Sequence, residues 1–397
     1  MIHSFRQFMV YLSYFWRAKK HWSWPKESEV LIFDACGEEL LREHLLDWSV
    51  EVIPVRGESI NIPVVLASLF ASGRKSEAYF DIYIHRVKPK LVLTFIDNTK
   101  AFYRLSRRHP LLKTMFVQNG WRGYHLDVFE QLDAGMKTAE QLAVDYMLCI
   151  GQAVGEHYQR YLSGTVVAMG SLRNNRQPRV DSVDHGSIVF ISQWDSKGFE
   201  IAGRFYSQDE FVGAVDRCLI GFLRQYAQQN GKELHFIPRT ALGSADRKKE
   251  ERHFSAILGR PCSFLEFDTQ GSSYQVIDQA ELVVGVDSTL LYEAAARGAK
   301  TAFFSIRGTI LGVKGFDFGW PVQYQSDGSF WTNSPSPERF KAVLDYLFSV
   351  SDDCWQTELK RVSFAKLITF DQGNSILKRT LKQALQPELQ AEQTRNC

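Results

Sequence analysis

Short runs of branched apolar residues alternate with longer amphipathic stretches along most of the chain. Runs such as EVLIFDA (residues 29–35), KLVLTFID (90–97) and KTMFVQ (113–118) are separated by stretches with helical spacing, such as GEELLREHLLDW (37–48). Near-continuous apolar strands between helices are typical of a parallel sheet that helices cover on both faces. The first half of the chain therefore predicts a doubly wound α/β domain.

A polar stretch, residues 170–187, interrupts this alternation, which restarts with IVFISQW (188–194), ELHFIP (233–238), SFLEFD (263–268), ELVVGV (281–286) and KTAFFS (300–305). We interpret the polar stretch as a linker between two doubly wound domains. Ligands of open parallel sheets bind at the carboxyl ends of the strands, which predicts a site in a cleft between the two domains. The expected units are an N-terminal aromatic and basic segment (1–28), two domains (29–175 and 176–375), and a C-terminal helix and tail (376–397).

Composition narrows the function classes. The 47 Lys and Arg residues nearly balance the 45 Asp and Glu residues, so the net charge of +2 does not favour nucleic acid as a partner. The six cysteines are scattered without a C-x-x-C pair, which favours a reducing cytoplasm and disfavours zinc. The chain also lacks a Walker A motif, a G-x-G-x-x-G motif and a D-x-D that could hold a metal on a nucleotide sugar. We therefore expect metal-independent chemistry without a bound cofactor.

The N-terminal segment has two interpretations. Residues 5–24 combine aromatic residues with the basic cluster Arg17, Lys19 and Lys20. Their apolar run is shorter than the ~18 residues of a spanning helix, and the cations follow it, unlike those of a secretory signal. Aromatic rings beside cations are typical of a helix at a membrane surface. A helix that packs on the protein's own core is the alternative.

The stretch VVGVDSTLLYEAAARG (283–298) places Asp287, Ser288 and Thr289 between an apolar strand and a small-residue helix. A helix N-terminus carries free N–H groups and partial positive charge, which suit a phosphate or a carboxylate. Glu293 does not have capping-box spacing, so we expect it to contact a ribose hydroxyl. The stretch predicts a nucleotide site, with plain helix capping as the alternative.

Further strand ends and helix starts of the second half carry residues that suit the same ligand. A guanidinium directly after a strand suits a diphosphate or a carboxylate, and short hydroxyl or amide side chains suit a phosphate or a base. A turn or a plain helix cap is the alternative for the hydroxyl and amide residues. The candidates are Ser192 and Gln193, Pro238 and Arg239, and Ser272 and Ser273.

Two carboxylates in the first half are candidate catalytic groups. Asp97 ends a strand and is followed by Asn98, while Glu58 lies in the loop VRGESINI together with Arg56. A carboxylate at the carboxyl end of a strand can act as a general base or a nucleophile. An N-cap for the next helix is the alternative role of Asp97.

The loop FVQNGWRG is a candidate sugar-binding edge. After a strand it presents two amides, an indole and a guanidinium, from Gln118, Asn119, Gly120, Trp121 and Arg122. Aromatic rings stack on sugar faces, and amides pair with sugar hydroxyls. We therefore expect this loop to orient an acceptor or a donor sugar.

Taken in order, LIFDACGEELL, VIPVRGESINIPVV, VKPKLVLTFIDNTKAFYRL, KTMFVQNGWRG and GSLRNN resemble bacterial surface carbohydrate (capsule and lipopolysaccharide) biosynthesis proteins. ELVVGVDSTLLYEAAARGAKTAFF is similar to the nucleotide-binding half of GT-B glycosyltransferases and CDP-glycerol transferases. The resemblance implies the GT-B fold, with the donor nucleotide on the C-terminal domain and the acceptor on the N-terminal one.

Related capsule enzymes use CMP-activated ulosonic acids, which they hold with a His-Pro element and a Ser-Ser or Ser-Thr pair. Ser288 and Thr289 match the pair, whereas Pro238 and Arg239 stand where the His-Pro element is expected. The resemblance implies transfer of an acidic sugar from a CMP donor to a surface glycan or a lipid-linked acceptor at the cytoplasmic face of the inner membrane. A CDP-glycerol-type polyol-phosphate transferase, a sugar epimerase of the same fold and a non-catalytic assembly subunit are the alternatives.

Overall fold

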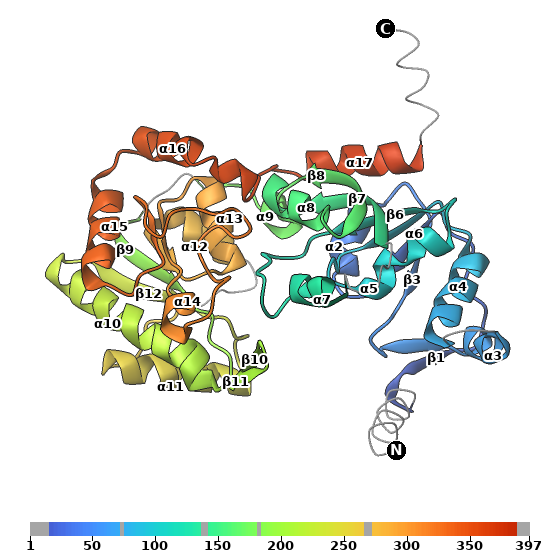
Figure 1. Ribbon diagram of the computed structural model, residues 1–397, viewed down its shortest axis with the longest axis horizontal. Coiled ribbons are helices and arrows are strands. Elements are labelled where there is room, and N and C mark those ends of the chain that lie inside the picture. The colour runs from blue at the N-terminus through green and yellow to red at the C-terminus, as the bar shows by residue number, and fades with distance from the viewer. Residues whose placement is uncertain (1–15, 72–74, 136–141, 181–183, 266–271, 387–397) are drawn as a thin grey trace, which may run out of the picture.

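The computed structural model describes residues 16–71, 75–135, 142–180, 184–265 and 272–386. It contains two α/β domains that lie side by side (Figure 1). Each domain is built on one main sheet, and neighbouring strands of each main sheet all run parallel. This matches the predicted pattern of buried strands joined by helices.

The N-terminal sheet has six strands in the order β3-β2-β5-β6-β7-β8. Strands β2 and β5 are buried at every position because all their residues except Thr94 are apolar and helices cover both of their faces. The strands are β2 (Val30–Phe33), β3 (Val50–Ile53), β5 (Leu91–Thr94), β6 (Lys113–Val117), β7 (Leu142–Cys149) and β8 (Leu162–Ala168). The helices are α2 (Glu38–Arg42), α3 (Ile62–Phe70), α4 (Lys75–Val87), α5 (Lys100–Tyr103), α6 (Leu105–Arg108), α7 (Val128–Gly135), α8 (Gln152–Tyr158) and α9 (Leu172–Arg176).

The C-terminal sheet has five strands in the order β12-β9-β13-β14-β15. These are β9 (Asp184–Ile191), β12 (Glu233–Ile237), β13 (Ala280–Gly285), β14 (Thr301–Phe304) and β15 (Trp331–Thr332), and β10 (Phe199–Ile201) and β11 (Arg204–Tyr206) form a separate pair. The helices are η2 (Asp209–Gly213), α10 (Ala214–Gln229), α11 (Ala245–Leu258), α12 (Ser273–Gln279), α13 (Thr289–Arg297), α14 (Arg307–Leu311), α15 (Pro337–Ser349), α16 (Asp352–Arg361), η3 (Phe364–Lys366) and α17 (Ser375–Leu385).

Both sheets change direction at an inner strand. β2 lies between β3 and β5, and β9 lies between β12 and β13, so in each sheet the second strand lies on one side of the first and the third on the other. Ligands of such sheets bind outside the carboxyl ends of the strands at this switch point. The prediction of two doubly wound, Rossmann-like domains, the architecture of the GT-B class, is confirmed.

The last helix returns to the first domain. Apolar residues of α17, among them Leu377 and Leu381, belong to the same buried cluster as Val30 and Leu91 of the N-terminal sheet. Figure 1 shows α17 lying over the N-terminal domain, beyond the end of the C-terminal one. The chain therefore crosses between the domains twice.

Three local expectations differ from the structure. Residues 5–15 of the expected membrane-surface helix lie outside the described residues, and Lys19–His21 form strand β1, which pairs in parallel with β4 (Ser59–Asn61). In SFLEFD, Phe264 forms only an isolated bridge with Phe236, and residues 266–268 are outside the described ranges. The expected linker contains helix α9, because Leu172 and Asn174 are buried against the domains that it joins. In the described part of the chain, no helix is long and apolar enough to cross a membrane.

Candidate functional site at the domain interface

The predicted sugar-binding loop and the predicted nucleotide-binding helix meet at the interface between the domains. The backbone N–H of Trp121 donates to the Thr289 hydroxyl, 2.8 Å away. The Trp121 ring lies flat on Tyr292 of α13, with ring centroids 3.5 Å apart and an interplanar angle of 8°. A Cβ on Gly120 would lie 3.2 Å from the Thr289 hydroxyl oxygen, which explains a glycine there. The sequence predicted that the Trp121 ring would stack on a sugar, but in the structure the ring packs on Tyr292 of the other domain.

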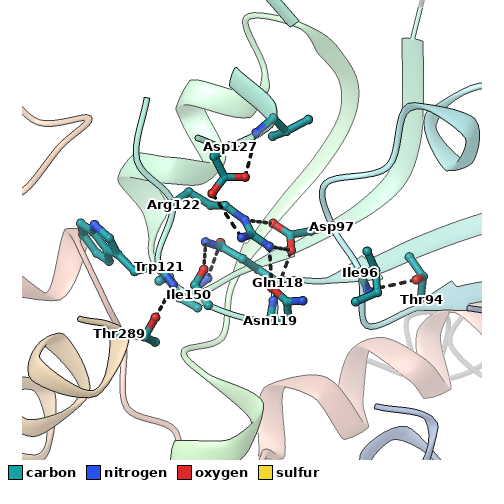
Figure 2. A network of polar contacts seen from close by, with 12 residues as sticks. Thr94, Ile96, Asp97, Gln118, Asn119, Trp121, Arg122, Asp127, Ile150 and Thr289 are labelled. Carbon is teal, nitrogen blue, oxygen red and sulfur yellow. Dashed lines mark hydrogen bonds and ion pairs between the residues drawn. The ribbon is translucent and has the colours of Figure 1, made fainter. Parts of the chain in front are cut away.

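Asp97 anchors this loop through Arg122 and Asn119 (Figure 2). Its carboxylate is fully buried and accepts hydrogen bonds from Arg122 Nε at 2.8 Å, from Arg122 Nη2, and from the Tyr158 hydroxyl at 2.7 Å. The Asn119 N–H donates to the same carboxylate at 3.3 Å. Because both oxygens are engaged, this geometry favours an anchoring role for Asp97 over the catalytic role that the sequence suggested.

The neighbouring residues complete the support of the loop. The Gln118 side chain donates to the Gly120 carbonyl at 2.8 Å and accepts from the Ile150 N–H at 3.0 Å, so it braces the turn. Arg122 also reaches Asp127 at 3.2 Å, and Asp97 and Asp127 together raise the pKa of its guanidinium against the opposing effect of burial. Asn98, in contrast, is exposed. Tertiary contacts thus hold Gln118, Asn119 and Arg122 in place.

Helix α13 begins with open hydrogen-bond donors. Ser288 is its N-cap, but the Ser288 side chain makes no capping hydrogen bond. The first N–H groups of a helix have no acceptor within the helix, so a capping side chain normally satisfies one of them. Asp287, Ser288 and Thr289 are all partly exposed. The helix start is therefore accessible and has donors for an anion.

Arg307, which sequence reasoning missed, lies beside this helix start. It follows strand β14 and pairs with Asp287 through Nη1, 2.5 Å from Oδ2. Gln193 joins the pair, because its side-chain oxygen accepts from Arg307 Nη2 at 3.2 Å and from the Asp287 N–H at 3.3 Å. Arg307 is 6% exposed, and its Nε has no hydrogen-bond partner among the described residues. The position of Arg307 three residues after an apolar strand, in FFSIRG, was an available signal.

A second cation lies next to this group. Arg239 is half exposed, pairs with Asp195 at 3.0 Å, and donates to the backbone oxygen of Gln193 at 3.3 Å. Its backbone N–H and the Ser192 hydroxyl both donate to the buried carboxylate of Glu250. Pro238 lies between this N–H and the end of β12. Ser192 therefore supports the strand ends, while the Arg239 guanidinium remains accessible.

Glu293 lies inside the interface and is not exposed to a ligand. The Tyr274 hydroxyl donates to its carboxylate at 3.1 Å, and Ser171 of the other domain bonds to the same carboxylate. Burial raises the pKa of Glu293 above its ordinary value. Ser272 is the N-cap residue of α12 and donates its N–H to the Gln275 side chain at 3.4 Å, whereas its hydroxyl is buried without a partner among the described residues. Ser273 begins the helix, just before Tyr274.

Arg56 and Glu58 lie apart from these residues. Arg56 Nε donates to the buried Asp34 at 2.7 Å, which raises the pKa of the guanidinium. Glu58 is exposed, and its carboxylate accepts from the Arg56 N–H at 3.1 Å. Both belong to the loop before β4, whereas Asp97 follows β5, and within the described residues Glu58 and Asp97 are not in contact. Within the described ranges, no group of three or more potential metal ligands is found.

Two Rossmann-like domains with an open helix start at the C-terminal switch point define a protein of the GT-B architecture. The family described as "putative O-antigen biosynthesis protein" matches residues 115–385, and the chain belongs to this family. Residues 115–385 include both the 118–122 loop and helix α13. A search of curated proteins found no match.

Solved structures resemble the chain only at low identity. The wall teichoic acid polymerase TagF is 7% identical, with a TM-score of 0.46, over 91% of this chain and 89% of the other. The UDP-GlcNAc 2-epimerase from Methanocaldococcus jannaschii is 10% identical, with a TM-score of 0.49, over 89% and 99%. Similarity at this level does not transfer a substrate from one protein to another.

Proposed function

We propose that the chain is a glycosyltransferase of surface glycan synthesis that binds a nucleotide-activated sugar at the N-terminus of α13. One observation carries the proposal: the N-cap residue Ser288 makes no capping bond, and it lies beside Asp287 and the guanidinium of Arg307. A helix start with open donors and a cation nearby suits a phosphate group. Membership of an O-antigen biosynthesis family supports a sugar as the group attached to it.

The chemistry of this site requires the phosphate to be bound and its negative charge to be offset. The first N–H groups of α13 and the Ser288 hydroxyl supply donors. Arg307 supplies positive charge, and Asp287 and Gln193 hold its guanidinium in place. As the bond between sugar and phosphate breaks, charge accumulates on the leaving phosphate, and preorganised donors stabilise that charge. The proposed reaction uses the nucleotide sugar as co-substrate, with no further cofactor and no metal.

The second cation, Arg239, supports a donor that carries a carboxylate as well as a phosphate. Gln193 contacts Arg307 with its side chain and Arg239 with its backbone oxygen, so the two arginines flank one residue. A donor with a phosphate and a carboxylate could use both. We therefore propose a CMP-activated ulosonic acid, such as pseudaminic acid, legionaminic acid or Kdo. A CDP-glycerol-type donor would have no carboxylate for Arg239.

The proposed acceptor is a glycan or a lipid-linked glycan on the side of the 118–122 loop. Asp97 and Gln118 hold this loop, so they act as positioning residues. Proximity to the cytoplasmic face of the inner membrane is consistent with exposed apolar side chains just after β1 and at the end of α3: Trp22 is 75% exposed and Phe70 is 89% exposed. Apolar residues beside Lys19 and Lys26 suit contact with anionic lipid.

Thermal unfolding with a panel of nucleotides tests the proposal. A ligand at one hundred times its dissociation constant stabilises a protein by ~2.7 kcal/mol, which raises the unfolding midpoint by several degrees. We expect CMP to raise the midpoint more than UDP, GDP or ADP. Turnover of CMP-ulosonic acids but not of CDP-glycerol would support the donor class. A preference for UDP would contradict the CMP donor, and no response to any nucleotide would favour a non-catalytic subunit.

A further inference from the structure

The N-terminal domain has a cavity that lies apart from the proposed donor site at α13. It has a volume of about 460 Å³ and lies between edge strand β3, helix α2 and the β1–β4 pair. Figure 1 shows β1 and β3 on the side of this domain that faces away from the C-terminal domain. The volume is in the range of sites for small organic ligands.

The walls of this cavity are held by contacts from several elements. The Asn61 side chain caps α3 by accepting from the Val64 N–H and donates to the Ser23 carbonyl at 2.8 Å, so it ties the segment after β1 to the domain. The guanidinium of Arg86 lies 4.1 Å from the ring centre of Trp24 and fixes that ring at the cavity wall. The cavity is therefore formed before any ligand binds.

The cavity offers hydrogen-bond acceptors beside aromatic rings. Glu51 accepts from the Tyr83 hydroxyl at 3.0 Å through Oε1, and Glu58 accepts from the Arg56 N–H at 3.1 Å through Oε2. The other carboxylate oxygen of each has no hydrogen-bond partner among the described residues. The rings of Trp24 and Tyr79 line the same space. A ligand with hydroxyl groups on one edge and an apolar face would satisfy both features.

The charges of the cavity select against a strongly charged ligand. Its lining contains three carboxylates (Glu38, Glu51 and Glu58) and three basic side chains (His21, Lys26 and Arg42). An anion would meet the carboxylates and a cation would meet the basic groups, so neither gains a clear advantage. Hydroxyl groups, in contrast, can donate to carboxylates and accept from Arg42 or Lys26.

We infer that this cavity binds a neutral sugar, separately from the nucleotide site at α13. Asp34 supports the site from the neighbouring switch point, because it binds Arg56 and thereby fixes the loop that carries Glu58. Asp34 has a φ of 82°, a conformation that costs a non-glycine residue energy and is found more often at functional sites. The inference does not depend on the proposed donor, because sugar binding here needs no nucleotide.

Saturation-transfer NMR on the full chain tests this inference. The probes are the methyl glycosides of glucose, galactose, N-acetylglucosamine and rhamnose, with glucuronic acid and glucosamine as charged counterparts. We expect at least one neutral glycoside to receive saturation at millimolar concentration, and its affinity to fall about tenfold in Glu51→Gln and in Glu58→Gln. Glu358→Gln, on the other domain, is the matched control and should leave the affinity unchanged.

The inference would be overturned if no neutral glycoside bound the folded protein, or if binding were the same in Glu51→Gln, Glu58→Gln and Trp24→Ala as in the parent. Stronger binding of glucuronic acid or glucosamine would also contradict it. Glu58 is exposed, so Glu58→Gln should fold even if Glu51→Gln does not. CMP binding measured on the same samples separates this outcome from a failure of the proposed donor site.

Discussion

The indole ring of Trp121 in the N-terminal domain stacks on the ring of Tyr292 in the C-terminal domain, with centroids 3.5 Å apart. Tyr292 is buried in helix α13, one turn after the open helix start at Ser288. The stack therefore joins the loop that Asp97 anchors to the helix that we propose binds the nucleotide.

Replacing Trp121 by alanine should weaken the contact between the 118–122 loop and helix α13. The stacking and the half-buried area of the ring together correspond to about 2 kcal/mol, which lowers the unfolding midpoint by several degrees. Amide hydrogen exchange at the start of α13 should become faster. Trp121→Phe should retain part of the effect, because a smaller ring can still stack. Unchanged exchange at α13 in Trp121→Ala would show that the stack does not order the helix start.

Asp97→Asn distinguishes an anchor from a catalytic base. Removing one partner of a buried ion pair destabilises a protein by ~3–5 kcal/mol, because the other charge stays buried. We expect Asp97→Asn to lose both stability and activity. Asp127→Asn, which removes the other partner of Arg122, should cost less, since Asp97 still pairs with the guanidinium. If Asp97→Asn abolished turnover with an unchanged unfolding midpoint, Asp97 would be catalytic after all.

Glu293 should make stability depend on pH. Burial raises its pKa in the folded state, so the protonated form is favoured there, and stability falls as the pH rises through that folded-state pKa. Glu293→Gln removes this penalty, so its stability relative to the parent should increase as the pH rises above the ordinary pKa of a glutamate. Thermal unfolding as a function of pH measures the difference.

Glu358→Gln is the control with the opposite sign. Arg361 lowers the pKa of Glu358, so the Glu358 carboxylate stabilises the fold above its ordinary pKa and loses that effect as the pH falls. The Gln variant should therefore be less stable than the parent at neutral pH and approach it in acid. If the stability of Glu293→Gln and that of the parent changed with pH in the same way, Glu293 would not titrate as its burial implies.

Membrane contact can be tested on Trp22, just after β1, and on Phe70, at the end of α3. Co-sedimentation with vesicles of phosphatidylglycerol should bind the parent protein and should bind a Trp22→Ser, Phe70→Ser variant several-fold less. Leu111→Ser, which replaces an apolar residue 99% exposed elsewhere on the N-terminal domain, is the control. Equal binding of all three proteins would exclude this surface as the contact.

Inner strands such as β2 (VLIF) could be predicted from sequence because they are short continuous apolar runs, which are typical of a sheet buried on both faces. Strands β1 and β4 could not, since KKH and SIN are polar and are strands only because they pair with each other. The helix start at Ser288 was also predictable, because short polar residues after an apolar strand are locally encoded.

The partners of the candidate residues were less predictable. Asp97 and Arg122 are 25 residues apart, and their pairing arises only when β5 and β6 lie side by side. Trp121 presents features of a sugar platform in sequence, but its ring is taken up by Tyr292, 171 positions later in the chain. Whether Ser288 caps its own helix depends on the side-chain conformation, which no pattern encodes.

Calorimetric titration of CMP into Ser288→Ala tests the central claim most directly. Because Ser288 makes no capping bond, we expect its loss to leave stability nearly unchanged but to weaken CMP about tenfold, a loss of ~1.4 kcal/mol. Ser351→Ala is the matched control: Ser351 does cap its helix, so this change should cost about 1 kcal/mol of stability and leave CMP affinity unchanged. Equal CMP affinity in Ser288→Ala and the parent would contradict a nucleotide site at the start of α13.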